Sequence, residues 1–304
     1  MKGYLGSLSY FEEVTCFNAM QTSTITATVL PIALGIIMFG LGLTLSIGDF
    51  TRILKYPKAV SIALICQMIL LPVICFLIAK IFALPPELAV GLMLLAASPG
   101  GATANLYSHL SNGDVALNVT LTAVNSFLTL FTLPLIVNFS LAHFITSEQY
   151  IPMQFAKVVE VFAIVLLPVT IGMLIKNKMP SFASKTEKPV KILSAVFLAL
   201  IIVSVNIREW QTLTTYFGNM GFPVLVFNLM SMAIGYFIPL LFRVDKRQAI
   251  AVGMEIGIHN GTLAIFIALS VLNNSAMSVP PALYSILMFF TAAIFGYLVK
   301  ERKT

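Results

Sequence analysis

Long apolar stretches separated by short polar ones dominate this chain of 304 residues. A run of about 20 apolar residues is long enough to cross a bilayer as a helix. Nine such runs predict about nine transmembrane helices, with the approximate ranges 25–45, 59–82, 88–110, 115–144, 155–175, 190–205, 224–241, 249–272 and 281–299. The fourth run exceeds the bilayer thickness, so we expect it to tilt, to bend near Pro134 or to extend past the membrane.

Two of the nine runs contain helix-breaking residues at comparable positions. The third includes the sequence SPGG at residues 98–101, and the eighth includes GIHNG at residues 257–261. Proline removes a backbone donor and glycine lowers the cost of leaving helical geometry, so both helices are expected to unwind. Paired broken helices in inverted halves of a membrane protein mark a binding site near the midplane. The alternative is two simple kinks, each relieved by a neighbouring helix.

The composition agrees with an all-α integral membrane protein formed by one polytopic unit. Hydrophobic residues make up 59% of the chain, charged residues 10%, and the mean hydropathy is +0.96. Soluble domains contain roughly 25% charged residues. The net charge of +6 does not indicate a nucleic-acid partner, because the basic residues are spread over several loops.

The distribution of Lys and Arg predicts the orientation, because cytoplasmic loops are enriched in these residues. With the N-terminus outside and the C-terminus in the cytoplasm, the outer loops hold Lys2, Lys80, Lys157 and Arg208. The inner loops then hold Arg52, Lys55, Lys58, Lys176, Lys178, Lys185, Lys188, Lys191, Arg243, Lys246, Arg247, Lys300, Arg302 and Lys303. This bias predicts an odd number of spans in the inner, or plasma, membrane.

Glu255 lies inside the eighth apolar run, beside the predicted break. A carboxylate at that depth costs several kcal/mol unless a partner satisfies it. The Lys and Arg residues all lie outside the deep parts of the predicted spans, which makes an ion pair the weaker interpretation. A buried carboxylate beside an unwound helix is typical of a cation site in a transporter.

Other polar residues near the breaks supply neutral oxygen atoms that suit sodium. Asn105 follows the first break, and Gln67 lies in the middle of the second run. Asn118, Thr122 and Asn125 follow one another at steps of four and three residues, so they share one helix face. For Asn125 alone, an interhelical hydrogen bond is at least as plausible an interpretation.

The half-helices after the breaks favour an anionic substrate. The first N–H groups of a helix lack partners within it and lie at its positive end. These positive helix ends predict a substrate carboxylate near Ala102, Thr103, Gly261 and Thr262, with Asn260 as a further contact.

At these residues the chain resembles the bile acid:sodium symporter family, in its bacterial branch. The resemblance rests on residues 35–45 with Asp49-Phe50, 99–101, 113–117, 255–260 and 279–283. It implies inverted repeats with two crossing broken helices, and it matches the nine-span members of the family. It also implies a panel domain (25–45 and 155–205) that faces a core domain (59–144 and 224–299).

The resemblance also implies two sodium sites. The first comprises Asn105, Asn118, Thr122 and Glu255, with Ala104 where bacterial relatives often have serine. The second comprises Gln67, Glu255, His259 and the backbone carbonyls of Ile256 and Ile258.

Two departures from the family pattern affect these expectations. Relatives usually have glutamine at His259, and imidazole is a poorer sodium ligand. The second site is therefore weakened, His259 acts through its backbone or orients another ligand, or it brings proton sensitivity. Where relatives have a His-Asn pair in the last span, this chain has Met288 and Phe289.

The sequence therefore predicts a sodium-coupled symporter of an organic anion. A small carboxylate such as pantoate or a 2-keto acid fits better than a bile acid. A sodium-independent or proton-coupled carrier or exporter is an alternative, as is a membrane receptor without transport. No catalytic motif such as HExxH occurs in the sequence, so we expect no enzyme.

Overall fold

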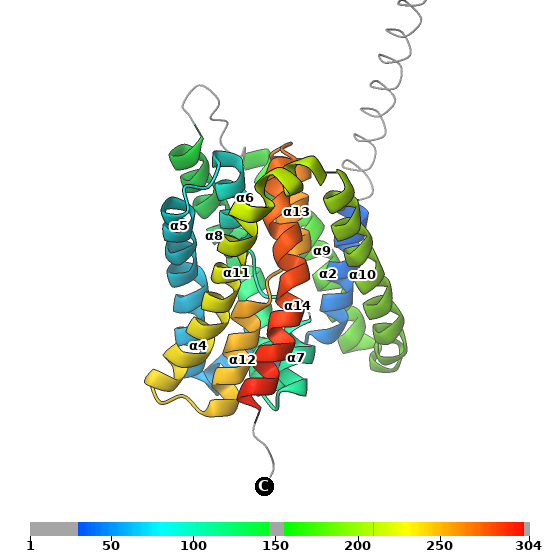
Figure 1. The fold of residues 1–304 in the computed structure, drawn as a ribbon. Coiled ribbons are helices and arrows are strands. Elements are labelled where there is room, and N and C mark those ends of the chain that lie inside the picture. The colour runs from blue at the N-terminus through cyan, green and yellow to red at the C-terminus, as the bar shows by residue number, and fades with distance from the viewer. Residues whose placement is uncertain (1–29, 102, 146–154, 209, 301–304) are drawn as a thin grey trace, which may run out of the picture.

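The computed structural model describes residues 30–101, 103–145, 155–208 and 210–300 (Figure 1). These residues form helices and no strands, and the only bridge of β type joins Gly100 to His259. The predicted all-helical class is thus confirmed for the described part of the chain. The predicted N-terminal segment before residue 30 lies outside it.

The helices follow the predicted order. They are α2 (Leu30–Thr44), α3 (Ile47–Thr51), α4 (Pro57–Ile65), α5 (Leu71–Ile81), α6 (Pro86–Ala97), α7 (Ala104–Leu110), α8 (Val115–Phe144), α9 (Phe155–Lys178), α10 (Pro180–Arg208), α11 (Trp210–Leu241), α12 (Lys246–Gly257), α13 (Gly261–Phe266) and α14 (Val279–Val299). A π-helical segment, Cys66–Leu70, joins α4 to α5, and another, Ile267–Val271, continues α13.

Proline and aspartate mark several helix starts. Pro57 and Pro86 begin α4 and α6, where a missing N–H group costs no helical hydrogen bond. The Asp114 carboxylate accepts from the N–H of Leu117 at 3.0 Å, and that of Asp245 accepts from Arg247 at the start of α12. These caps satisfy N–H groups that the helix itself leaves free.

Six helices in the described residues are long and apolar enough to cross a membrane. A seventh candidate is the bent pair of α2 and the segment Ile47–Leu54, whose axes differ by 71°. The remaining apolar helices belong to the two interrupted runs, and each part is too short to span alone.

Two helices begin well before the apolar ranges that predicted them. The runs 190–205 and 224–241 correspond to α10 and α11, but α10 begins at Pro180 and α11 at Trp210. Hydropathy marks the part of a helix that suits hydrocarbon, whereas backbone hydrogen bonding continues into polar sequence. The lysines expected in a loop after α9 therefore lie on helices.

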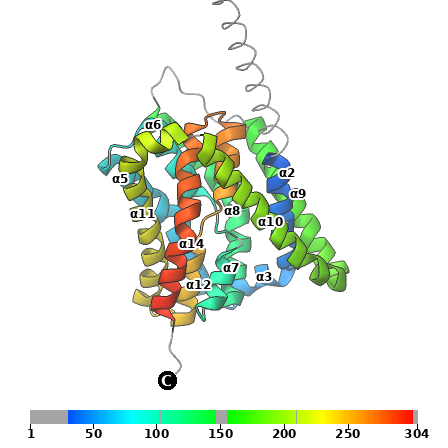
Figure 2. The same ribbon diagram turned by 45° about the vertical axis from the view of Figure 1, so that its right-hand side comes forward.

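The helices form two groups. Helix α2 packs against α9 and α10, and Figure 2 shows these three helices together at one side of the molecule. The other group surrounds the interrupted helices, which are buried along most of their length. Helices α11, α8 and α14 pack around them.

Both interruptions occur where the sequence predicts them, and they meet each other. Helix α6 ends at Ala97 and α7 starts at Ala104, while α12 ends at Gly257 and α13 starts at Gly261. The N–H of Gly101 donates to the Ile258 carbonyl at 2.6 Å, and the N–H of Asn260 donates to the Pro99 carbonyl at 2.8 Å. The two breaks therefore satisfy each other's backbone groups, as buried non-helical backbone at membrane depth requires.

Candidate functional site

Glu255 lies at the centre of the site and is fully buried. Its Oε2 accepts from the Thr122 hydroxyl at 2.6 Å, and its Oε1 accepts from the Asn125 amide at 3.1 Å. The backbone of Gly100 also donates to this carboxylate. Within the described residues, no Lys or Arg forms an ion pair with it. The carboxylate is therefore solvated by neutral donors, without a protein counter-charge.

Gly100 brings the first break into contact with this carboxylate. A Cβ atom added at Gly100 would overlap the Glu255 carboxyl group, so only glycine leaves room there. One residue later, a Cβ at Gly101 would lie 3.1 Å from the nearest atom, the His259 carbonyl oxygen. The close approach is thus specific to the residue that faces Glu255.

The Thr122 hydroxyl has two acceptors within reach. It lies 2.6 Å from Glu255 Oε2 and 3.0 Å from the carbonyl of Asn118. A hydroxyl has one proton and two lone pairs, so it can donate to only one acceptor at a time. If it donates to Asn118, its oxygen becomes available, together with the carboxylate, to a cation.

Four buried amide oxygens, on Gln67, Asn105, Asn118 and Asn125, make no hydrogen bond within the described part of the chain. The Asn118 amide donates to the Ala251 carbonyl at 2.7 Å, which leaves its Oδ1 free. The Oδ1 atoms of Asn105 and Asn125 and the Oε1 of Gln67 are also buried and without a hydrogen-bond partner. Buried polar atoms are usually satisfied, and a cluster of exceptions calls for a water or an ion. Such an oxygen-rich set fits a hard cation like sodium.

Two further polar side chains lie within hydrogen-bond distance of the Ser98 carbonyl oxygen. Gln67 Nε2 donates to it at 3.0 Å, and His259 Nδ1 lies 3.3 Å from it. Because a carbonyl only accepts, this contact places the proton of a neutral imidazole on Nδ1. His259 Nε2 is then a buried lone pair without a partner, and the ring stacks on Phe227.

The structure brings together only some members of the two ion sites that the resemblance implies. Thr122 touches Glu255 directly, whereas Gln67 and His259 meet at Ser98, two residues before Gly100. Ile256 is buried in α12, and the Ile258 carbonyl already accepts from Gly101. Ala104 is buried at the start of α7.

Four of the five residues predicted for an anion, Thr103, Asn260, Gly261 and Thr262, lie at the starts of α7 and α13. Asn260 caps α13, because its Oδ1 accepts from the N–H of Leu263 at 3.1 Å. Its NH₂ group is then the end that can meet an anion. Several early N–H groups expected to be free are bonded, since Ala104 donates to Gly101 and Gly261 donates to His259.

The other predicted substrate residues differ in their surroundings. Thr262 is buried, Thr103 is half-buried, and Gly261 packs against Ser285. Ala102 lies outside the described residues. In the last span, Met288 is buried, while Phe289 stacks on Tyr107 and its carbonyl accepts from the Tyr107 hydroxyl at 3.1 Å.

Sequence reasoning missed two contributors to this site and left a third open. The sequence does not decide whether Asn125 offers an oxygen to sodium or an interhelical hydrogen bond, although it shares a helix face with Asn118 and Thr122. That periodicity is the signal that identifies it. Ser98 and Gly100 act through backbone atoms, so their residue types gave no indication of their partners.

The chain is similar in sequence to several proteins described as sodium-dependent transporters or sodium cotransporters. The chain is 28% identical over 273 residues to an uncharacterized sodium-dependent transporter of Bacillus subtilis, covering 89% of this chain and 82% of that protein. It is 26% identical over 311 residues to the ileal sodium/bile acid cotransporter of Oryctolagus cuniculus, covering 99% and 89%.

A third relative is a probable chloroplastic sodium/metabolite cotransporter of Oryza sativa subsp. japonica, 26% identical over 258 residues. The match covers 84% of this chain but spans only 60% of the length of that protein. The profile of the Sodium Bile acid symporter family matches residues 31–216, more than half of the chain. The family resemblance read from the sequence is confirmed, and the chain belongs to the Sodium Bile acid symporter family.

Proposed function

We propose that this protein imports a small organic carboxylate together with sodium. Membership of the family and three relatives described as sodium-dependent or sodium-coupled support Na⁺ as the coupling ion. The observation that carries the proposal is the Glu255 carboxylate, which is buried, has no basic partner among the described residues and is bonded by Asn125, whose amide oxygen is unpartnered. Sodium there would neutralise the carboxylate and satisfy that oxygen.

Ion binding would influence transport by fixing the geometry of the two breaks. Glu255 on α12 holds Thr122 and Asn125 of α8 and contacts Gly100 in the first break. A bound cation would fix these elements relative to one another. The early turns of α7 and α13, which belong to the same breaks, would then take the geometry that binds the anion.

The two groups of helices support an alternating-access movement. In this proposal, α2, α9 and α10 form a panel, and the helices around the breaks form a core that moves against it. Six long helices, α2 and the two interrupted helices would together give nine spans in inverted repeats. The N-terminus would lie outside and the C-terminus inside the plasma membrane.

The basic residues support this orientation. In Figure 1, the starts of α4 and α12 lie at the same end as the C-terminus. Lys58 and Lys246 belong to the first turns of these two helices, and Lys300 follows α14. An excess of Lys and Arg at one end is typical of the cytoplasmic side.

The few polar groups near the breaks favour a small substrate. Asn260 offers one NH₂ group, and Thr262 and Thr103 add hydroxyls. Met288 and Phe289 replace polar side chains with apolar ones in the last span, so polar contacts known from relatives are absent there. We therefore expect a small carboxylate, with pantoate and 2-keto acids as the first candidates.

The test is uptake into proteoliposomes driven by a sodium gradient, compared with potassium at equal ionic strength. Pantoate, a 2-keto acid and a bile acid are offered in parallel to wild type and Glu255→Gln. We expect sodium-dependent uptake of a small carboxylate in wild type. The variant should lose it, because a neutral amide cannot balance the charge of the bound cation.

The other outcomes select other functions. Uptake that follows a pH gradient and ignores sodium would replace symport with proton coupling. Sodium-specific binding without movement of any solute would favour a receptor. Normal sodium-driven uptake by Glu255→Gln would remove Glu255 from the mechanism.

A further inference from the structure

We propose that Asn125 binds sodium directly through its side-chain oxygen and sets the preference for sodium over lithium. The inference rests on the proposed function and adds a ligand to the first site, beyond the four residues that the family resemblance implies.

The orientation of the Asn125 amide is fixed by Glu255. Its Nδ2 donates to Glu255 Oε1 at 3.1 Å, and the side chain is fully buried. Turning the amide over would place Oδ1 against the carboxylate, and two acceptors would then face each other. Oδ1 is therefore the end of the amide that does not face Oε1.

That oxygen accepts no hydrogen bond from the residues that the structure describes. Asn125 Oδ1 is inaccessible to solvent and makes no hydrogen bond. An asparagine that only joins two helices is expected to use both ends, because a buried polar atom left unpaired costs about 1–3 kcal/mol. Here Nδ2 donates to the Glu255 carboxylate, the negative charge that would balance a cation, and Oδ1 offers a free lone pair. This pattern is expected of a cation ligand.

Other side-chain oxygens lie on the same face of α8 as Asn125. Thr122 and Asn118 precede Asn125 on the same face of α8, and Thr122 already touches the other oxygen of Glu255. Asn118 Oδ1 is likewise buried without a donor. Asn125 therefore extends a row of oxygens along α8 by one more ligand.

An additional ligand has a consequence for ion selectivity. Selectivity between hard cations of the same charge depends on cavity size and on the number and flexibility of the ligands. Lithium is smaller than sodium and is satisfied by fewer oxygens. Removing the Asn125 oxygen should therefore weaken sodium binding more than lithium binding.

The experiment measures thermal stability of the purified protein in sodium chloride and lithium chloride titrations, with potassium chloride keeping the ionic strength constant. Asn125→Leu keeps the branched shape of the side chain but removes both the oxygen and the Nδ2 donor to Glu255, and Asn125→Ala is the smaller alternative. We expect the sodium concentration for half-maximal stabilisation to rise about tenfold or more. The lithium value should rise less, so that the sodium-to-lithium preference falls.

A matched control is Thr120→Val, also buried on α8, whose hydroxyl is satisfied by the Ala116 carbonyl at 2.9 Å. It should leave both titrations unchanged. If the Asn125 variants only melt earlier in potassium, with both half-maximal concentrations and their ratio unchanged, Asn125 is structural and the inference fails. Glu255→Gln distinguishes this failure from that of the proposed function, because it tests sodium binding itself.

Discussion

At the scale of single residues, the site depends on a backbone position as much as on side chains. Gly100 lies against the Glu255 carboxylate, and a methyl group there would occupy the same space as the carboxyl atoms. Since Thr122 and Asn125 hold that carboxylate from α8, it has little freedom to move aside. Gly100 therefore determines the distance between the first break and the Glu255 carboxylate.

Gly100→Ala should consequently abolish or strongly weaken the sodium-dependent rise in melting temperature, and it should cost about 1–3 kcal/mol of stability through overpacking. Gly101→Ala is the matched control, because the atom nearest to its new Cβ would be the His259 carbonyl oxygen at 3.1 Å, with no overlap of the Glu255 carboxylate. The measurement is the melting temperature of each variant with and without sodium. An undiminished sodium response in Gly100→Ala would contradict this account.

The sequence anticipated part of this site for a definite reason. Glu255 is recognisable because a carboxylate is costly in an apolar run, and Asn118 and Thr122 because they follow a helical period. The contacts of Ser98 and Gly100 are made by backbone atoms, and any residue type has those atoms. Such contacts become visible only when the two breaks are placed side by side.

At the scale of elements, the packing of α2 on α9 depends on glycine. A Cβ at Gly42 would overlap the Val169 backbone, and a Cβ at Gly172 would lie 2.7 Å from the Phe39 carbonyl oxygen. The two helix backbones therefore approach closely, as small residues allow in membrane proteins. Hydropathy alone predicted both spans, but it contains no information about which faces meet.

Gly172→Val should separate these two helices and lower stability by about 1–3 kcal/mol, since larger side chains in a packed interface force backbone shifts. Gly221→Ala serves as the control, because nothing lies within 4 Å of the added Cβ. Thermal unfolding in detergent compares the two. Equal melting temperatures for wild type and Gly172→Val would argue against the close contact.

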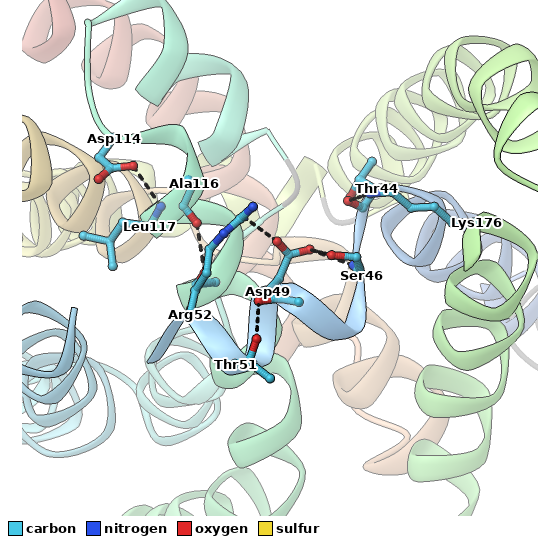
Figure 3. A network of polar contacts seen from close by, with 11 residues as sticks. Thr44, Ser46, Asp49, Thr51, Arg52, Asp114, Ala116, Leu117 and Lys176 are labelled. Carbon is cyan, nitrogen blue, oxygen red and sulfur yellow. Dashed lines mark hydrogen bonds and ion pairs between the residues drawn. The ribbon is translucent and has the colours of Figure 1, made fainter. Parts of the chain in front are cut away.

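At the scale of the whole molecule, the short segment after α2 connects the two helix groups. Figure 3 shows Asp49 at the centre of a polar network in which its carboxylate accepts from Ser46 and forms an ion pair with Arg52 at 2.6 Å. Helix α3 packs against α8, and Lys176 of α9 donates to the Thr44 carbonyl at the end of α2. The turn between the groups is thus held from both sides.

Asp49→Ala should remove this network without touching the ion site. The Asp49 carboxylate accepts from the backbone N–H of the N-cap residue Ser46, and loss of this half of the capping box is expected to cost about 0.5–2 kcal/mol. If the segment transmits the movement between the two helix groups, the maximal uptake rate should fall while the sodium concentration for half-maximal uptake stays the same. Uptake measured over a range of sodium concentrations separates these effects, with the exposed Thr51→Val as control.

The pairing of the two breaks also restricts how the chain can change in evolution. Pro99 and Gly101 bond to Asn260 and Ile258 in a fixed antiparallel order. A residue inserted into either break would shift this order by one position and turn Gly100 away from Glu255. The lengths of two segments about 160 positions apart are therefore coupled, because a one-sided insertion or deletion would lose both hydrogen bonds. Homologous proteins should consequently vary in composition within these breaks much more readily than in length.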